Sequence, residues 1–166
     1  MLSFRLGMIL SKGCSKEVIN HFRNKYKFAF WFKLNEQFTK KQFESDEVLI
    51  EPTGLYDDSF SGIGSFGLYV TDFSKIEKEF KEDPSMIDTF RERNKSYEKD
   101  CLKWIDIIKE MRMDYKIPKV GIFHFDGNDV TEKIDFPEYI RSYCKISDLT
   151  MEKLMKIKQN EIMFFI

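Results

Sequence analysis

The chain has 166 residues, of which 42% are hydrophobic, 16% aromatic and 33% charged, and its formal net charge is -1. Such a chain can bury one sizeable core without disulfides or metal, so the composition excludes a disordered protein and predicts a single domain over residues 1–166. The three cysteines lie far apart in the sequence, which favours neither a disulfide framework nor a zinc site and is typical of a reducing, cytoplasmic location.

Strand patterns dominate the first 70 residues. The continuous aromatic run FAFWFKL is too short and too apolar for an amphipathic helix, so it predicts a buried strand. Pro52 is expected to end a short strand, because proline lacks the N–H group that a ladder uses. In chain order we expect a strand within residues 1–13, a helix from about Ser15 to Tyr26, and strands at Phe28–Leu34, Val48–Ile50 and Phe66–Val70.

The clearest helix pattern begins at Asp83-Pro84, which ends a short helix capped by Asp72 or Ser74 and starts the next one. Apolar residues then recur at alternating spacings of three and four, so one side of a long helix is apolar. We expect this stripe to pack on the protein's own sheet, with a coiled-coil dimer as the alternative. Its polar member marks either the edge of the buried zone or a residue that fixes register. The stripe consists of Ile87, Phe90, Asn94, Tyr97, Cys101, Trp104, Ile108 and Met111.

The last third of the chain completes a mixed pattern of strands and helices. KVGIFHF predicts a strand, Asp126-Gly127 a tight hairpin turn, and VTEKIDF a returning strand. Phe136-Pro137-Glu138 opens a turn or short helix, Ser147 or Thr150 caps a final helix to about Lys158, and EIMFFI closes the chain as a strand. The predicted fold class is α+β, a mostly antiparallel sheet with helices packed on it and one long central helix.

Charge is distributed unevenly along the chain. Residues 1–41 carry nine Lys or Arg against two Glu, whereas no Lys or Arg occurs from Gln42 to Ser74. We call this second stretch the acidic segment. It is either a solvated face balanced by basic residues elsewhere, or a docking surface that repels nucleic acid and attracts a basic protein. Its acidic residues are Glu44, Asp46, Glu47, Glu51, Asp57, Asp58 and Asp72.

Gly62, Gly64 and Gly67 match the spacing G-x-G-x-x-G within the acidic segment. A dinucleotide fingerprint needs a strand before the glycines and a helix directly after them, whereas here polar residues precede and a strand follows. GIGSFG resembles the glycine-rich loop of protein kinases, but the chain lacks their Val-Ala-Ile-Lys, His-Arg-Asp and Asp-Phe-Gly motifs. We therefore interpret residues 62–67 as a place where the backbone turns or approaches a neighbour closely.

GLYVTDFSKIEKEF, residues 67–80, resembles the strand-then-helix segment of ADP-ribosyltransferases. In that family the Gly-x-Tyr strand faces the nicotinamide end of NAD, an N-terminal strand supplies an Arg or His for the ribose, and a late strand supplies a catalytic Glu. The resemblance implies these roles for Tyr69, Arg5 and Glu161. The chain lacks the family's Ser-Thr-Ser motif and its opening His-Gly or Arg-Gly pair. An NAD-binding enzyme is therefore the alternative prediction for this chain.

Other catalytic patterns are incomplete. His21 and His124 come without a nucleophile at a recognisable spacing, so we expect both to be structural. DGNDVTEKIDF lacks the central glycine and the twelfth-position Glu of a calcium loop. The sequence thus predicts no catalytic set, no cofactor and no metal.

An acidic, glycine-containing middle segment without a catalytic set is similar in general character to the small cytoplasmic immunity proteins of contact-dependent bacterial toxin systems. This likeness implies a non-enzymatic module that occludes the basic active site of a nuclease-type toxin. We expect no nucleic-acid or membrane partner, because the basic residues are scattered and no run approaches the roughly 20 apolar residues of a span. We expect a monomer or weak dimer. The predicted contacts are Glu51, Asp57, Asp58, Asp126 and Asp129.

Overall fold

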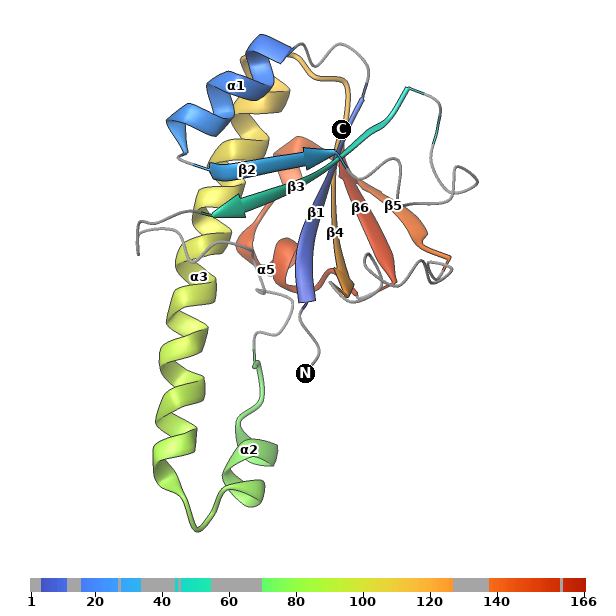
Figure 1. Ribbon diagram of the computed structural model, residues 1–166. Coiled ribbons are helices and arrows are strands. Elements are labelled where there is room, and N and C mark those ends of the chain that lie inside the picture. Colours follow the sequence, from blue (N-terminus) through green and yellow to red (C-terminus); the bar gives the residue numbers. More distant parts are fainter. Residues whose placement is uncertain are drawn as a thin grey trace.

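The computed structural model describes residues 4–11, 16–26, 28–33, 44, 46–54, 70–126, 138–158 and 160–166. These residues form one six-stranded sheet in the order β2-β3-β1-β4-β6-β5, with helices packed on it (Figure 1). The strands are β1 (Phe4–Leu10), β2 (Phe28–Lys33), β3 (Val48–Gly54), β4 (Val120–Asp126), β5 (Ile140–Cys144) and β6 (Glu161–Phe165). The helices are α1 (Lys16–Lys25), α2 (Ser74–Glu79), α3 (Pro84–Met113), a 3₁₀ turn at Ile146–Asp148, and α5 (Met151–Met155).

Neighbouring strands of the sheet are antiparallel except at one edge, where β5 and β6 run parallel. The centre is the β1–β4 pair, whose register matches Leu10 with Val120. Val120 also pairs with Phe165, so the C-terminal strand lies beside the centre of the sheet. The predicted α+β class with a mostly antiparallel sheet is confirmed.

The core lies between one face of the sheet and the described helices. Alternate residues of β1 face this core, because successive side chains of a strand point to opposite faces. In α3 the predicted stripe is buried from Asn94 onwards, and its buried apolar side chains belong to the core cluster, which confirms that it packs on the protein's own sheet. Buried members of the core cluster include Leu6, Met8, Leu10, Phe22, Tyr97, Cys101, Trp104, Ile108, Met111, Val120, Ile122, Leu154 and Phe165.

Asn94 is the polar member of the stripe, and the buried part of α3 begins at this residue. Its side chain is buried, its Nδ2 donates to the Val70 carbonyl at 2.8 Å, and its Oδ1 accepts from the Val70 N–H at 3.0 Å. The amide thus pairs with one backbone unit as a neighbouring strand would. This contact attaches the chain entering α2 to α3.

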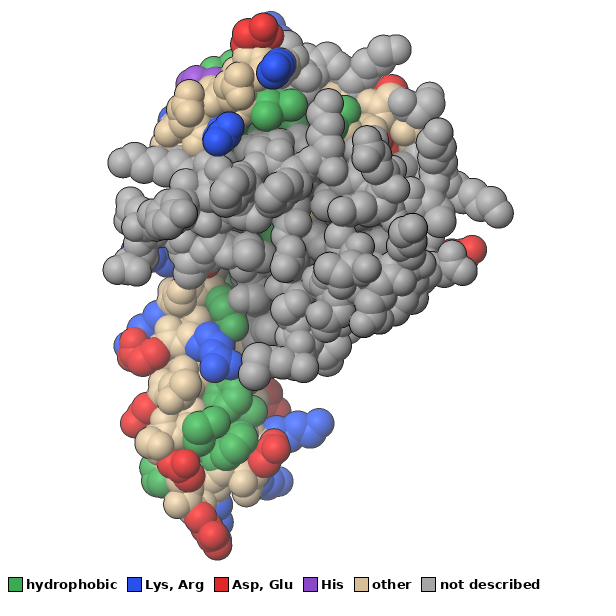
Figure 2. Space-filling view, viewed as in Figure 1, with side chains coloured by type: hydrophobic (Ala, Val, Ile, Leu, Met, Phe, Trp, Pro, Cys, Tyr) green, Lys and Arg blue, Asp and Glu red, His purple; other side chains and the backbone are tan. Residues whose placement is uncertain are grey.

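The first half of α3 and the short α2 form a helical arm that extends beyond the sheet (Figure 1). Its apolar side chains are only half-buried, and Figure 2 shows them gathered where the two helices meet, with charged groups around them. Phe80 and Phe90 pack at 5.9 Å between ring centroids. The N-cap of α2 is Phe73, without a side-chain cap bond, and not Asp72 or Ser74 as predicted, although the Asp72 carboxylate accepts from the Ser74 N–H at 2.9 Å. The arm therefore has a small apolar contact of its own.

Three elements differ from the sequence prediction. β3 continues through Pro52, contrary to the expectation that proline ends the strand. It pairs with β1 only at Val48–Ile50 and with β2 over Ile50–Gly54, so among the described strands Pro52 has a neighbour on one side only. β5 was not expected, and the final helix is shorter, ending at Met155. Thr150 caps it as expected, accepting from Lys153 N–H at 3.3 Å.

Several expected features lie outside the described residues. They are the strand at 66–70 except Val70, the glycines of 62–67, and the hairpin turn and returning strand that follow Asp126.

Two glycines in the centre of the sheet leave room for aromatic rings on the face opposite the helices. A Cβ atom at Gly7 would lie 2.3 Å from the ring of Phe123, its cross-strand partner. A Cβ atom at Gly121 would likewise lie 2.7 Å from the Phe164 ring. Phe123 also packs edge-to-face on Tyr139 at 5.3 Å between ring centroids. Glycine is required at both positions because an aromatic ring lies close to the backbone there.

Gly7→Ala is expected to lower the free energy of unfolding by about 2 kcal/mol, because the added methyl group overpacks a buried ring. Urea denaturation measures the effect. In a Phe123→Leu background the same Gly7→Ala change should cost much less, because the smaller side chain leaves room for the methyl. Equal costs in both backgrounds would contradict the overpacking explanation.

Candidate functional site

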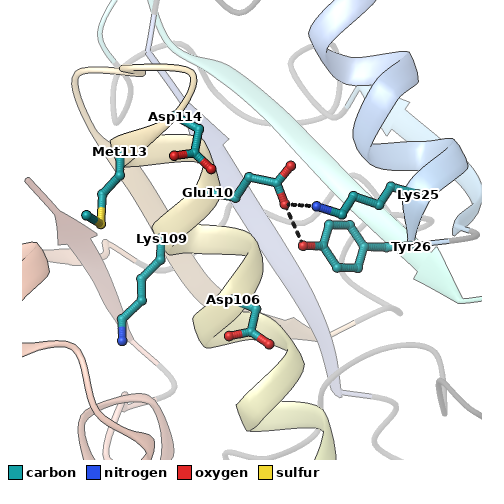
Figure 3. Close-up of a pocket in the computed structure, with 7 residues that line it drawn as sticks. All are labelled: Lys25, Tyr26, Asp106, Lys109, Glu110, Met113 and Asp114. Atoms are coloured by element: carbon teal, nitrogen blue, oxygen red, sulfur yellow. Dashed lines mark hydrogen bonds and ion pairs between the residues drawn. The ribbon is translucent and has the colours of Figure 1, made fainter.

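An open pocket of about 530 Å³ lies beside the C-terminal half of α3, where α1 ends against it (Figure 3). Helical periodicity places residues four apart on one side of α3. Asp106, Glu110 and Asp114 are acidic residues at this spacing. The lining residues are Lys25, Tyr26, Asp106, Lys109, Glu110, Met113 and Asp114.

Glu110 ties α3 to the end of α1. One carboxylate oxygen accepts from Lys25 Nζ at 2.6 Å and from the Tyr26 hydroxyl at 2.7 Å, and the other lies 3.1 Å from Nε2 of His21. Burial alone would raise the pKa of Glu110, but the hydrogen bonds from Lys25, Tyr26 and His21 outweigh it and hold the pKa below its usual value. Burial and the bond to Glu110 raise the pKa of Tyr26. The tyrosine therefore stays protonated as a donor, and the cluster has a structural role.

Asp106 and Asp114 are the other two acidic residues of the pocket. Both are exposed, and neither carboxylate forms an ion pair with a described residue. Although Asp106 and Lys109 are three residues apart, they form no pair, whereas Glu92 and Lys95 do, at 2.6 Å. Beside them Met113 is 63% exposed. The pocket thus offers two carboxylates, the ammonium group of Lys109 and an apolar side chain to a ligand.

A second cluster of charges lies on the face of the sheet opposite the helices, and it changes the interpretation of the acidic segment. Glu47, just before β3, is buried. Its carboxylate receives two hydrogen bonds from Arg141 of β5, one at 3.1 Å, and pairs with Lys119 Nζ at 2.8 Å. Glu44 pairs with the same Lys119 at 2.5 Å. These two carboxylates are therefore neutralised internally, which favours for them the alternative in which basic residues elsewhere balance the acidic segment.

The aromatic ring of Phe164 contacts both cations of this cluster. The Arg141 guanidinium lies 4.4 Å and the Lys119 ammonium 5.4 Å from the ring centroid, both within cation–π range. Burial alone would raise the pKa of Glu47, but the hydrogen bonds from Arg141 and Lys119 lower it. Burial likewise opposes the charge on Arg141, yet the bond to Glu47 leaves the pKa of Arg141 raised. The cluster links the start of β3 to the far edge of the sheet.

The predicted partner contacts are only partly within the described structure. Glu51 lies in β3 and Asp126 ends β4, but the structure describes only their backbone. Asp57, Asp58 and Asp129 lie outside the described residues. Their roles stay predictions.

The predicted NAD residues are also partly described. Arg5 of β1 pairs with Phe125 and Ile162 of β6 pairs with Phe123, so Arg5 and Glu161 lie at the same end of the sheet with β4 between them. The Glu161 carboxylate accepts from the Ser142 hydroxyl at 2.6 Å and from the Lys158 N–H at 3.2 Å. Tyr69 lies outside the described residues. The NAD site stays a prediction, which calorimetric titration with NAD can test.

Two buried titratable groups elsewhere, His124 and Cys101, are held in their neutral forms. Burial lowers the pKa of His124 to about 4, so at neutral pH this histidine is uncharged. Burial and the nearby carboxylates of Asp100 and Glu98 raise the pKa of Cys101 to about 12. No group of three His, Cys, Asp or Glu side chains in the described part could hold a metal ion.

The sequence interpretation missed the two clusters for different reasons. The four-residue spacing of Asp106, Glu110 and Asp114 is visible in the sequence and could have indicated an acidic side of α3. The partners of Glu47 are far away in the chain, so no local pattern identifies them.

Comparison of the chain with protein-family models, curated proteins and solved structures finds no match. None of the helices within the described ranges is long and apolar enough to cross a membrane.

Proposed function

We propose that the protein is a non-enzymatic binding module for a basic protein partner. The observation that carries the proposal is the pair of exposed carboxylates, Asp106 and Asp114, which line an open pocket without an ion pair to any described residue. Met113, exposed in the same pocket, adds apolar contact area. A lysine or arginine of a partner suits this combination, because its aliphatic stem packs on apolar surface while its head pairs with carboxylates.

The partner class favoured by this chemistry is a nuclease-type toxin domain. Such an enzyme needs a basic active site to hold the phosphate backbone, and a small protein that covers the site blocks it by occlusion. Exposed carboxylates then set the association rate and buried contacts the residence time. The protein would act as an immunity protein in the bacterial cytoplasm. Its contacts would be Asp106 and Asp114 together with Glu51, Asp57, Asp58, Asp126 and Asp129.

The test is co-expression with the product of the neighbouring gene, followed by measurement of the association rate at low and high salt. Asp106→Lys/Asp114→Lys and Asp57→Lys/Asp58→Lys should each slow association about tenfold at low salt, because they reverse rim charges that steer encounter. Higher salt should reduce the difference from the unmodified protein.

The matched control is Asp88→Lys/Glu92→Lys, which makes the same change of charge on two exposed carboxylates of the helical arm, 73% and 71% exposed. This control should associate at the unmodified rate. If neither acidic pair alters the rate, the electrostatic proposal is wrong.

A further inference from the structure

β5 forms one edge of the described sheet, and its surface is unusual for an edge. Ile140 is 61% and Tyr143 56% exposed, although both are large and apolar. No described strand pairs with the outer side of β5. Edge strands that must stay separate usually carry charged side chains, proline or a bulge, because an open ladder can pair with another chain. β5 has no proline and no bulge within Ile140–Cys144, and its one charged side chain, Arg141, is already paired with Glu47.

The backbone of β5 is oriented for such pairing. Ile140 N–H donates to the Asn160 carbonyl and Cys144 C=O accepts from the Ile166 N–H, both on the β6 side. Because backbone groups alternate between the two sides of a strand, the N–H and C=O of Tyr143 point away from β6.

We propose that β5 pairs antiparallel with β5 of a second copy of this chain, with Ser142 opposite Ser142 across the twofold axis. This register places Arg141 opposite Tyr143 of the second copy, and a twofold axis repeats each contact. One step further out it places Tyr139 opposite Lys145. Each of these cross-strand pairs sets a cation against an aromatic ring, which is an attractive combination.

The neighbouring registers lack this complementarity. An axis through residue 141 sets Arg141 opposite Arg141, and an axis through residue 143 sets Arg141 opposite Lys145 on both sides. Like charges directly opposite one another destabilise a strand pair. Charge therefore selects the register centred on Ser142 and favours a second copy of the chain over an unrelated strand as the occupant. In the proposed dimer Arg141 keeps its contacts with Glu47 and Phe164.

The first experiment is sedimentation equilibrium over a range of protein concentrations. The purified protein should show a reversible dimer, and Tyr143→Lys should weaken it about tenfold or more, because the change sets lysine opposite arginine. Leu102→Lys is the matched control, since Leu102 is 57% exposed but lies on α3. It should leave the dimer unchanged.

The second experiment tests register by oxidation. Residues 142 would form a non-hydrogen-bonded antiparallel pair, with Cα atoms about 4.5 Å apart, within the range that a disulfide spans. Ser142→Cys should therefore give a covalent dimer joined at position 142, whereas Ser147→Cys, in the 3₁₀ turn, should not. A protein that is monomeric at every concentration, or a dimer that Tyr143→Lys leaves intact, would overturn the proposal. A monomer that instead binds a foreign strand at β5 would also overturn it.

Discussion

Glu47→Ala is expected to lower the free energy of unfolding by about 3 kcal/mol. The side chain of Glu47 is fully buried, and its partners Arg141 and Lys119 are only 22% and 16% exposed. Removing the carboxylate would leave the Arg141 guanidinium without its charge partner in a poorly solvated place. The cost reflects the uncompensated cation more than the net value of the ion pair.

Glu44→Ala is the matched control for this prediction. Glu44 pairs with the same Lys119, but its side chain is 57% exposed, so its loss should cost less than about 1 kcal/mol. Replacing both members of the buried pair, as Glu47→Met with Arg141→Met, should cost less than Glu47→Ala alone, because no buried charge is left over. Guanidinium denaturation would measure all three proteins, and a double variant that loses as much stability as Glu47→Ala or more would contradict this explanation.

The parts of the fold that could be predicted are those with a local signal. The stripe of α3 repeats every three or four residues over many turns, so both the helix and its buried side followed from spacing. Pro84 in the first turn of α3 and Thr150 before α5 correctly indicated where these helices begin, because both are local signals of a helix start. Asn94 could be recognised as a polar member of the stripe, but not its partner Val70.

The elements that were missed depend on contacts between distant residues. IRSYC has five residues and no regular alternation of apolar and polar side chains, and it becomes strand β5 because β6 lies beside it. The neutralisation of Glu47 depends on Lys119 and Arg141, which are distant in the sequence and lie beside it only in the folded sheet. A run without lysine or arginine therefore showed where negative charge lies in the chain, but not whether that charge faces solvent.

The second large effect is a loss of stability in mild acid caused by His124. Burial lowers the pKa of this side chain to about 4, compared with about 6.5 when the chain is unfolded. As pH falls through 6.5, the unfolded chain binds a proton that the folded protein still excludes, so the free energy of unfolding decreases. Between pH 7 and pH 5 the loss should be about 2 kcal/mol, and it should continue until pH 4.

Between pH 7 and pH 5 the effect of His124 on stability can be distinguished from the effects of the buried carboxylates. Glu47 and Glu110 have lowered pKa values, so their contributions are present above the unfolded carboxyl pKa and are lost only at more acid pH. Urea denaturation at pH 7 and pH 5 should therefore show the loss in the unmodified protein and only a small part of it in His124→Gln. His21→Gln, which removes the other histidine from an exposed position, should retain most of it. If His124→Gln loses as much stability as the unmodified protein over this range, then His124 does not cause the loss. In that case burial does not keep His124 neutral in the folded protein.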